Sequence, residues 1–239
     1  MALLISQVGG WLTSLYSAVA RKCGLFVLPL LLFSISPADE IEELSVTEAD
    51  GAYSLRIVSV LDAPVDYVYD VITDYKHAYR INPTITEVEI LPSDRDEVVR
   101  VRNLSEHWVG PFCFKIYWAG DIVESRHGHL NVSTIPELSS FKSGSAVWEL
   151  RSQGERTWVL HESILKPDFF MPPVIGNHIM KKQMKKDTLD TFSRIECYAK
   201  VMFDMDMENE PELMKNILTE GKDCINTQGE SAHLSLETK

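Results

Sequence analysis

The sequence has few of the residues and spacings from which metal, redox and nucleotide sites are built. Its four cysteines include no CxxC pair, which argues against a zinc or redox motif. Its seven histidines form no HExxH motif, and the chain contains no Walker A, GxGxxG or GxSxG sequence. We therefore expect no metal, no cofactor and no catalytic residue that a motif would identify.

Positive charge is also scarce. Lys and Arg number 23 against 35 Asp and Glu, which gives a net charge of −12 and a pI of about 5.0. A nucleic-acid binder normally has a basic face and a high pI, so we expect no nucleic-acid partner. Lysines concentrate in KKQMKK, residues 181–186, which would either approach an anionic membrane or form a solvated helix face. The sequence leaves the oligomeric state open.

The cysteines other than Cys23 and Cys224 are Cys113 and Cys197. Both are expected to be buried thiols, because free cysteine behaves as a small apolar residue. A Cys113–Cys197 disulfide is the alternative in an oxidising compartment.

The sequence contains one long apolar run, at residues 23–36. Arg21 and Lys22 precede it, and the SPADE sequence at its end fits the small-residue pattern before a cut after Ala38. The run is shorter than the ~20 residues of a spanning helix. We predict that residues 1–38 are an export signal peptide, or alternatively an uncleaved membrane anchor. The protein is then exported, to the periplasm in a Gram-negative host.

Past this segment the pattern is mostly that of β-strands. Asp50-Gly51 between two alternating runs predicts a hairpin. Pro64 and the apolar spacing after it predict a short helix at 65–72, and KHAYRINPTI predicts a second. Short strands with tight connections favour an antiparallel meander. The predicted strands are 42–48, 52–61, 85–91, 98–104, 112–123, 129–135, 143–151 and 157–165.

A long amphipathic helix is predicted from Pro172 to about Met202. Methionine adapts to irregular apolar partners, so a stripe rich in Met and Thr predicts a lid over a cavity, with plain core packing as the alternative. The acidic segment 204–239 is predicted to be a mobile tail. The stripe contains Met180, Met184, Thr188, Thr191, Ile195, Tyr198 and Met202.

Several motifs carry a resemblance to a known family. Ala63-Pro64, Thr73-Asp74-Tyr75 and Asn82-Pro83-Thr84-Ile85, with the hairpin, proline turn and helix from Ser145 onward, resemble the START-like (SRPBCC) superfamily. That superfamily includes polyketide cyclases, coenzyme-Q-binding proteins and pollen-allergen-like lipid carriers. The resemblance covers about residues 42–200. It implies an α+β helix-grip domain at 39–203, with a curved antiparallel sheet around a long C-terminal helix and two short helices after the first main strand.

The resemblance also implies a cavity between the sheet and the last helix that takes a hydrophobic small molecule. Our first hypothesis is non-enzymatic binding or transport of a lipid, isoprenoid or quinone-like molecule. The alternatives are a cyclase-, aromatase- or hydratase-like enzyme and a protein-interaction domain. Strand alternation gives the even-numbered residues of 112–118 one apolar face. The expected lining residues are Met180, Met184, Thr188, Thr191, Phe112, Phe114, Ile116, Trp118 and Trp148.

Three pairs of polar residues also invite a functional interpretation. His161 and Glu162 suggest acid–base chemistry, but neighbours on a strand face opposite sides, so at most one lines the cavity. Arg100 and Arg102 share a face that would meet an anionic head group or, as we prefer, lie in solvent. His127 and His129 would either ligate a metal with a carboxylate or, as we prefer, be solvated imidazoles at a turn.

Overall fold

A computed structural model describes residues 40–109, 112–125, 128–169 and 175–208. These residues belong to the second of two units, residues 37–239, and the first unit is residues 1–36. The predicted signal or anchor segment and residues 209–239 of the predicted tail therefore lie outside the described residues. None of the described helices combines the length and the apolar character that a membrane crossing requires.

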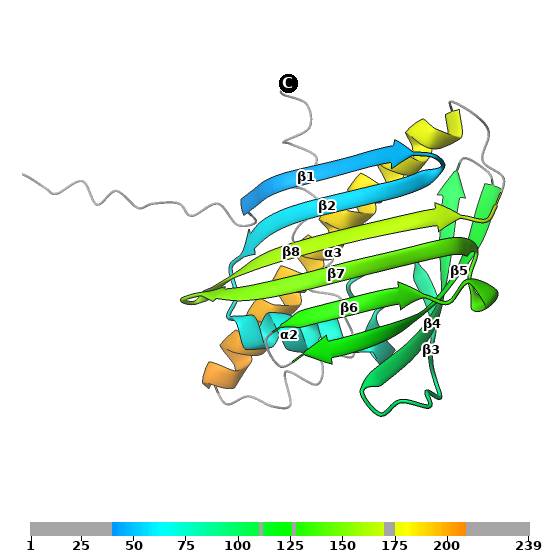
Figure 1. Ribbon diagram of the computed structural model, residues 1–239. Helices are drawn as coiled ribbons and strands as arrows, with labels where there is room; N and C mark the ends of the chain where they lie inside the picture. The colour runs from blue at the N-terminus through cyan, green and yellow to red at the C-terminus, as the bar shows by residue number, and fades with distance from the viewer. Residues whose placement is uncertain (1–39, 110–111, 126–127, 170–174, 209–239) are drawn as a thin grey trace, which may run out of the picture. The chain divides into compact units, whose positions relative to one another are not determined.

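The described residues form one antiparallel sheet of eight strands with a long helix behind it (Figure 1). The strand order is β1-β2-β8-β7-β6-β5-β4-β3, so only the β2–β8 neighbours are distant in sequence. The strands are β1 (Glu40–Ala49), β2 (Ala52–Leu61), β3 (Ile85–Leu91), β4 (Val98–Val109), β5 (Phe112–Ser125), β6 (His129–Thr134), β7 (Phe141–Gln153) and β8 (Arg156–Pro167). The helical segments are α2 (Val65–Thr73), the 3₁₀ turns η1 (Tyr75–His77) and η2 (Pro136–Leu138), and α3 (Ile175–Glu208).

This architecture confirms the predicted α+β helix-grip fold, with two local differences. The predicted second helix is only the three-residue turn η1. Its first residues bend because the Asp74 carboxylate holds the His77 ring, with 2.7 Å from Oδ1 to Nδ1, and the Arg80 guanidinium, with 3.1 Å from Oδ2 to Nη1. The final helix runs to Glu208 rather than Met202, since no Gly or Pro interrupts it before Pro211.

The first hairpin shows why the sequence could predict this sheet. Asp50 and Gly51 connect β1 to β2, and both have positive φ, 53° and 74°. Two consecutive left-handed residues are what a two-residue hairpin turn requires, and Asp-Gly supplies them at low cost. The pairing of Ala49 with Ala52 follows directly, and it sets the register of both strands.

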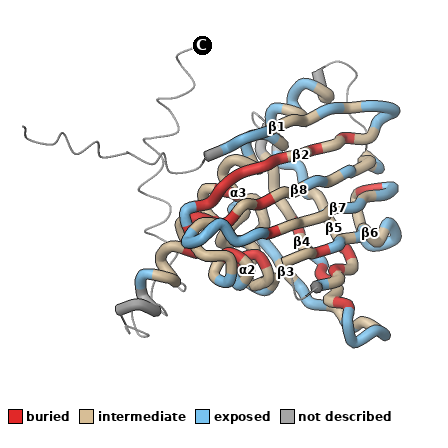
Figure 2. The backbone as a smooth tube through the Cα atoms, turned by 60° about the vertical axis from the view of Figure 1, so that its left-hand side comes forward, coloured by how far each residue is buried: buried red, intermediate tan, exposed pale blue. Residues whose placement is uncertain are grey.

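The hydrophobic core lies at one end of the molecule. It is built by side chains of α2, the C-terminal half of α3, β2, β6, β7 and β8. Figure 2 marks buried residues along the backbone in red. Two buried polar groups fix the corner between β2 and α2. The Glu196 carboxylate accepts a hydrogen bond from the Asp62 backbone N–H at 3.0 Å, and the Thr157 hydroxyl donates to the Ala63 carbonyl at 2.7 Å. The core residues are Ile57, Leu61, Ala63, Val68, Val71, Ile72, Leu130, Leu150, Val159, Phe192, Ile195, Tyr198 and Ala199.

Candidate functional site

Two contacts identify which face of the sheet lies toward the helices. The Tyr69 hydroxyl of α2 donates to Glu124 of β5 at 3.2 Å, and His107 of β4 reaches Asp187 of α3. Glu124 is an even-numbered residue of β5, and Phe114 is the direct partner of His107. Because alternate residues share a face, the even-numbered side chains of β5 face the helices. The predicted apolar face of 112–118 is therefore the inner one.

The long helix α3 packs very differently in its two halves. We call residues 192–202, with α2 and the core residues around them, the packed end. Phe192, Ile195, Glu196, Tyr198 and Ala199 are buried there. We call residues 176–191, with the strand residues that face them, the open end. None of the helix residues 176–191 is buried.

Position on the helix does not explain this difference. Met184, Thr188 and Ile195 lie on one line along α3 at 100° per residue, yet only Ile195 is buried. Both ends of residues 176–191 are held against the sheet, because the Asn177 amide donates to Glu48 of β1 at 2.9 Å and Asp187 lies beside β4. The open end is therefore held near the sheet, but none of its helix residues is buried.

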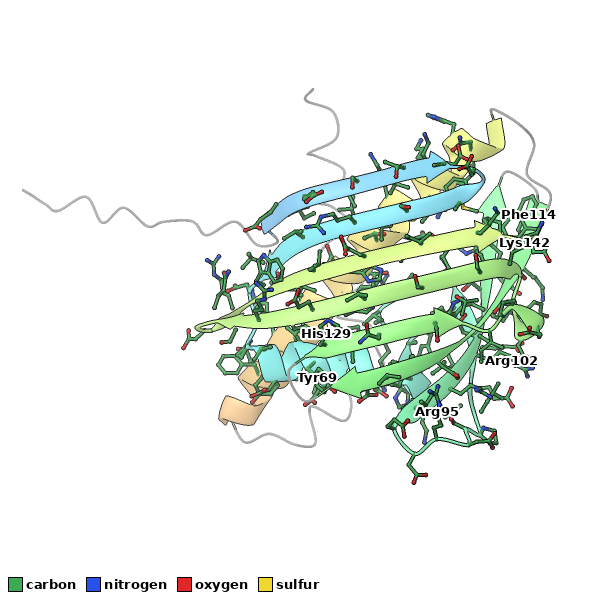
Figure 3. The ribbon with its side chains drawn as sticks, viewed as in Figure 1. Tyr69, Arg95, Arg102, Phe114, His129 and Lys142 are labelled. Atoms are coloured by element: carbon green, nitrogen blue, oxygen red, sulfur yellow. The ribbon has the colours of Figure 1, made fainter. Side chains whose placement is uncertain are left out.

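The residues predicted to line a cavity do not share one environment, and Trp148 among them packs against the core. Met180, Met184, Thr188 and Thr191 are half-buried, and so are Ile116, Trp118 and Trp148. The side chain of Phe114 is 50% exposed and lies at the end of the sheet opposite to Tyr69 (Figure 3). The side chain of Phe112 lies outside the described residues. No contact unites these residues as a set, so their role as a lining stays a prediction.

One predicted residue, Trp118, is held in a defined orientation. Its indole lies over Gly120, where a Cβ would approach ring atoms to 2.4 and 2.7 Å. The indole N–H donates to the Thr134 hydroxyl at 3.1 Å. Gly120 therefore makes room for a flat aromatic surface on the inner face of β5.

The predicted Trp148 belongs to a stack that separates the two ends. Its ring lies 4.0 Å from the His161 ring and 5.7 Å from the Phe192 ring, nearly parallel to both. The Nδ1 atom of His161 is buried and has no hydrogen-bond partner among the described residues. Burial lowers the pKa of His161 from 6.5 to about 4, against the opposing effect of a backbone hydrogen bond at Val147. His161 is thus a neutral, inward-facing imidazole at neutral pH.

Its neighbour Glu162 lies on the other face, as strand alternation predicts. Glu162 pairs with Arg56, which also contacts Glu43 at 2.9 Å. All three side chains are well exposed. Of the two candidates for acid–base chemistry, only His161 faces the helix side.

The polar contact at the open end was missed by sequence reasoning. The sequence pattern places His107 near a turn, but β4 continues to Val109, so His107 is a strand residue. Its Nδ1 lies 3.8 Å from Oδ2 of Asp187, and each side chain is only 20% exposed. The Gln183 amide donates to Oδ1 of Asp187 at 2.7 Å. Alternation from the buried Val101 would have placed His107 inward, had the strand been extended far enough.

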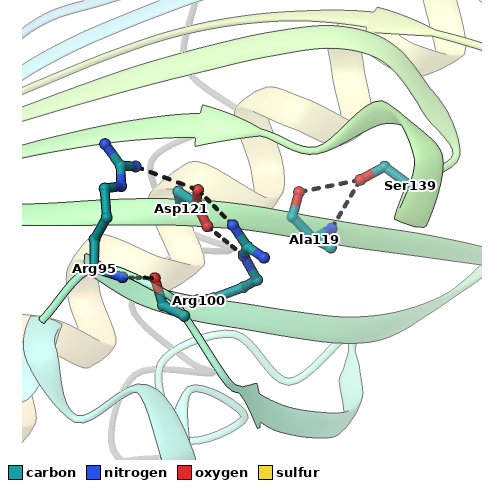
Figure 4. A network of polar contacts seen from close by, with 6 residues as sticks. Arg95, Arg100, Ala119, Asp121 and Ser139 are labelled. Carbon is teal, nitrogen blue, oxygen red and sulfur yellow. Dashed lines mark hydrogen bonds and ion pairs between the residues drawn. The ribbon is translucent and has the colours of Figure 1, made fainter.

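Arg100 and Arg102 lie on the outer face, as we preferred. Arg100 binds Asp121 through Nε at 2.6 Å and Nη2 at 2.9 Å, and Arg95 adds a contact at 3.6 Å (Figure 4). The Arg100 guanidinium lowers the pKa of Asp121. Arg102 pairs with Glu89. These guanidinium groups are satisfied by carboxylates of neighbouring strands.

The prediction of buried free thiols was wrong for both cysteines. Cys113 is free but exposed, because it is odd-numbered in β5 and so points outward. Cys197 is disulfide-bonded rather than free. Since Cys113 is free, the alternative Cys113–Cys197 disulfide is likewise absent.

The histidine pair of the β5–β6 turn is only partly described. The ring Nδ1 of His129 lies 3.2 Å from the Asn131 amide, and His127 lies outside the described residues. In the part of the chain that the structure describes, no three His, Cys, Asp or Glu side chains gather as a metal site would require.

Two pockets have linings among the described residues. A pocket of about 60 Å³ lies at the packed end, and its lining includes Asp74, Arg80 and Tyr198. A shallow groove of about 230 Å³ runs between β1 and α3. Sites for small organic ligands usually measure about 300–1,000 Å³. Both volumes lie below this range, so neither pocket by itself identifies a site for a small organic ligand.

These features define the class of helix-grip proteins, in which a curved sheet and one long helix enclose the inner face. The chain belongs to the family described as polyketide cyclase / dehydrase and lipid transport, whose sequence profile matches residues 61–222. This confirms the resemblance to START-like proteins. The fold of that family implies binding of hydrophobic ligands. No curated protein sequence matches this chain.

Solved structures share the fold at low sequence identity. The Zhui aromatase/cyclase from Streptomyces sp. R1128 is 14% identical with a TM-score of 0.53, covering 62% of this chain and 94% of its own. A START superfamily protein from Mycobacterium smegmatis is 11% identical with a TM-score of 0.51, covering 62% and 98%. A protein from Thermus thermophilus is 17% identical with a TM-score of 0.50, covering 60% and 94%. At such identities the likeness concerns the fold alone.

Proposed function

We propose that this protein binds and carries a hydrophobic small molecule at the open end, between the inner face of the sheet and residues 176–191 of α3, without chemical turnover. The observation that carries the proposal is the contrast along α3. A helix that is buried over residues 192–199 presents no buried side chain over residues 176–191, although both ends of that segment contact the sheet. Protein interiors are close-packed, so a helix segment that is held near the sheet but not buried is where we place a guest.

The chemistry of the open end supports an apolar guest. Met180, Met184 and Trp118 present flexible thioethers and a flat indole, both of which adapt to apolar surfaces of varied shape. Burial of apolar area stabilises such a complex by about 25 cal/mol per Å², before the costs of association are subtracted. A lipid, an isoprenoid and a quinone-like molecule all meet this description.

Native mass spectrometry of the full chain, purified without detergent, tests the proposal. We expect an added mass that organic extraction removes, and we expect the extracted protein to bind the neutral dye N-phenyl-1-naphthylamine. Met184→Trp should fill the open end and abolish dye binding while the protein stays folded. Ile179→Trp, at an exposed position of the same helix, is the matched control. A protein that carries no adduct and binds no dye is not a carrier.

A second candidate function is a cyclase- or aromatase-like reaction in the same space. One observation favours it: the buried Nδ1 of His161 is unpartnered among the described residues, and the imidazole is neutral at neutral pH and thus able to accept a proton. The ligand-free protein would then convert an aromatic polyketide-like substrate, and His161→Ala would abolish turnover but not dye binding. If the wild-type protein shows no turnover, the carrier function is the one of these two candidates that remains.

We further propose a contact between α3 and anionic membranes. His178, Lys181, Lys182 and Lys185 line the groove beside Val46 of β1, so one face of an acidic protein is locally basic. Each lysine near an anionic surface contributes about 1 kcal/mol of attraction. Sedimentation with phosphatidylcholine vesicles should require added phosphatidylglycerol and weaken with salt. Replacing the three lysines by Gln should abolish it, and vesicle binding that ignores both changes would refute the contact.

Export remains a proposal that the sequence of residues 1–38 supports. The apolar run behind Arg21 and Lys22 and the small residues before Asp39 are its basis. N-terminal sequencing of the protein from its host should find a chain that begins at Asp39. A full-length chain in the membrane fraction would favour the anchor, and a full-length chain in the cytosol would refute export.

A further inference from the structure

A polar pair spans the interior at the open end, between an outlying strand and the long helix. Nδ1 of His107 on β4 and Oδ2 of Asp187 on α3 lie 3.8 Å apart, which is too far for a hydrogen bond. Oδ1 of Asp187 already accepts a hydrogen bond from the Gln183 amide at 2.7 Å. The structure thus leaves one carboxylate oxygen and one ring nitrogen facing each other, each able to bind a third group.

The walls around this pair differ in polarity. Alternation along β4 places Asn103 and Ser105 on the same inner face as His107. Their direct partners on β5 are Trp118 and Ile116. A molecule at the open end would therefore meet hydrogen-bonding groups along β4 and α3 and an aromatic, apolar surface along β5. This asymmetry suits a ligand with one polar end and an apolar body.

The electrostatics of Asp187 indicate which charge the polar end of the ligand should carry. Burial raises the pKa of Asp187, and the nearby Asp190 acts in the same direction, while Gln183, His107 and Lys186 oppose it. A carboxylate that is already costly to desolvate disfavours a second anion beside it. It favours a neutral donor, because a hydrogen bond to a charged acceptor is stronger than one between neutral groups.

We propose that His107 and Asp187 form the polar end of the ligand site, and that the ligand is a neutral apolar molecule carrying a hydroxyl group. The hydroxyl donates its one hydrogen to Oδ2 of Asp187 and accepts a hydrogen bond from Nδ1–H of His107. An oxygen about 2.8 Å from both atoms satisfies normal hydrogen-bond lengths across the observed gap. This proposal rests on the carrier function proposed above and specifies the class of molecule that it serves.

The test compares three ligands that share one ring system: 2-naphthol, naphthalene and 2-naphthoate. Each displaces N-phenyl-1-naphthylamine from the full-length protein at neutral pH. A hydrogen bond to a charged group typically contributes about 1.5–3 kcal/mol, so 2-naphthol should bind about ten- to hundredfold more tightly than naphthalene, with 2-naphthoate weakest. Asp187→Leu should remove the preference for the naphthol and keep naphthalene binding. Asp187→Asn should also improve binding of the naphthoate.

Controls separate this proposal from the carrier function. Asp204→Asn changes an exposed carboxylate of the same helix and should leave all three affinities unchanged. His107→Leu provides a second variant if Asp187→Leu fails to fold by circular dichroism, and it too should weaken the preference. A wild-type protein that binds the dye but shows equal affinity for the three ligands refutes the hydroxyl site alone. A wild-type protein that binds neither dye nor ligands refutes the carrier function and this proposal with it.

Discussion

The two halves of helix α3 share one face along the helix but differ in how far that face is buried. Over residues 192–199 the stripe is buried against α2 and the sheet, with Phe192, Ile195 and Tyr198 nearly inaccessible. Over residues 176–191 the same stripe, with Met184 and Thr188, remains half-buried. The C-terminal half of the helix is thus fixed in the core, whereas the N-terminal half stays partly exposed beside the sheet.

The difference matches the chemistry of the residues in each half. The packed end uses rings and branched aliphatic side chains that fix one arrangement. The open end uses thioethers, which are flexible and tolerate several arrangements. A rigid anchor beside an adaptable surface is a suitable basis for binding apolar molecules of more than one shape.

Truncation at the two ends should give the largest contrast. Phe192→Ala removes a buried ring that stacks on Trp148, and such changes cost about 3–5 kcal/mol of unfolding free energy. Met184→Ala at the open end should cost about 1 kcal/mol or less, since the thioether is not close-packed. Urea denaturation followed by circular dichroism measures both. Equal losses would show that the interior is solid throughout, and the carrier proposal would lose its basis.

The pH dependence of the unfolding free energy should report on His161, whose ring stacks on Trp148 between the packed end and the open end. Its pKa in the folded protein is about 4 instead of 6.5, so between these values the unfolded chain binds a proton that the folded protein does not. Stability is therefore complete above pH 6.5 and falls as the pH drops toward 4, by up to about 3 kcal/mol.

A substitution isolates this contribution from that of other titrating groups. His161→Gln should reduce the loss of unfolding free energy on acidification, whereas His178→Gln, at an exposed position on α3, should not. Chemical denaturation at neutral pH and at about pH 4.5 measures the difference. An unchanged pH dependence in His161→Gln would mean that this ring is solvated rather than part of the packed boundary.

The smallest effect is expected at Thr188, which is half-buried in the open end. Its hydroxyl donates to the Met184 carbonyl of its own helix at 2.7 Å, so it is already satisfied. Thr188→Val should change the unfolding free energy by no more than about 1 kcal/mol and leave the affinity for 2-naphthol unchanged. Thermal unfolding and dye displacement measure these quantities. A tenfold loss of affinity for 2-naphthol would indicate that Thr188, rather than Asp187, binds the ligand hydroxyl.

Much of the fold was predictable because its signals are local. Asp50-Gly51 specified a hairpin, alternation assigned the inner face of β5, and the absence of Gly and Pro after the first turn of α3 specified one long helix. Errors arose where local signals end. β4 extends past Leu104 because pairing with β5 sustains it, and the segment after α2 closes into a 3₁₀ turn through the contacts of Asp74.

The candidate site was less predictable, for a related reason. Strand and helix periodicity determined which side chains share a face, so Trp118 and Met184 were expected to be inner residues, and His161 and Glu162 were expected to face opposite sides. Periodicity does not reveal which residues on the faces of two different elements contact each other. His107 and Asp187 are 80 positions apart, and only the curvature of the sheet around α3 brings them within 3.8 Å. The sequence by itself determined the elements and their apolar faces, because these depend on neighbours along the chain. The tertiary structure decided which of these faces are buried and which stay partly exposed, because packing depends on side chains that meet only after the chain has folded.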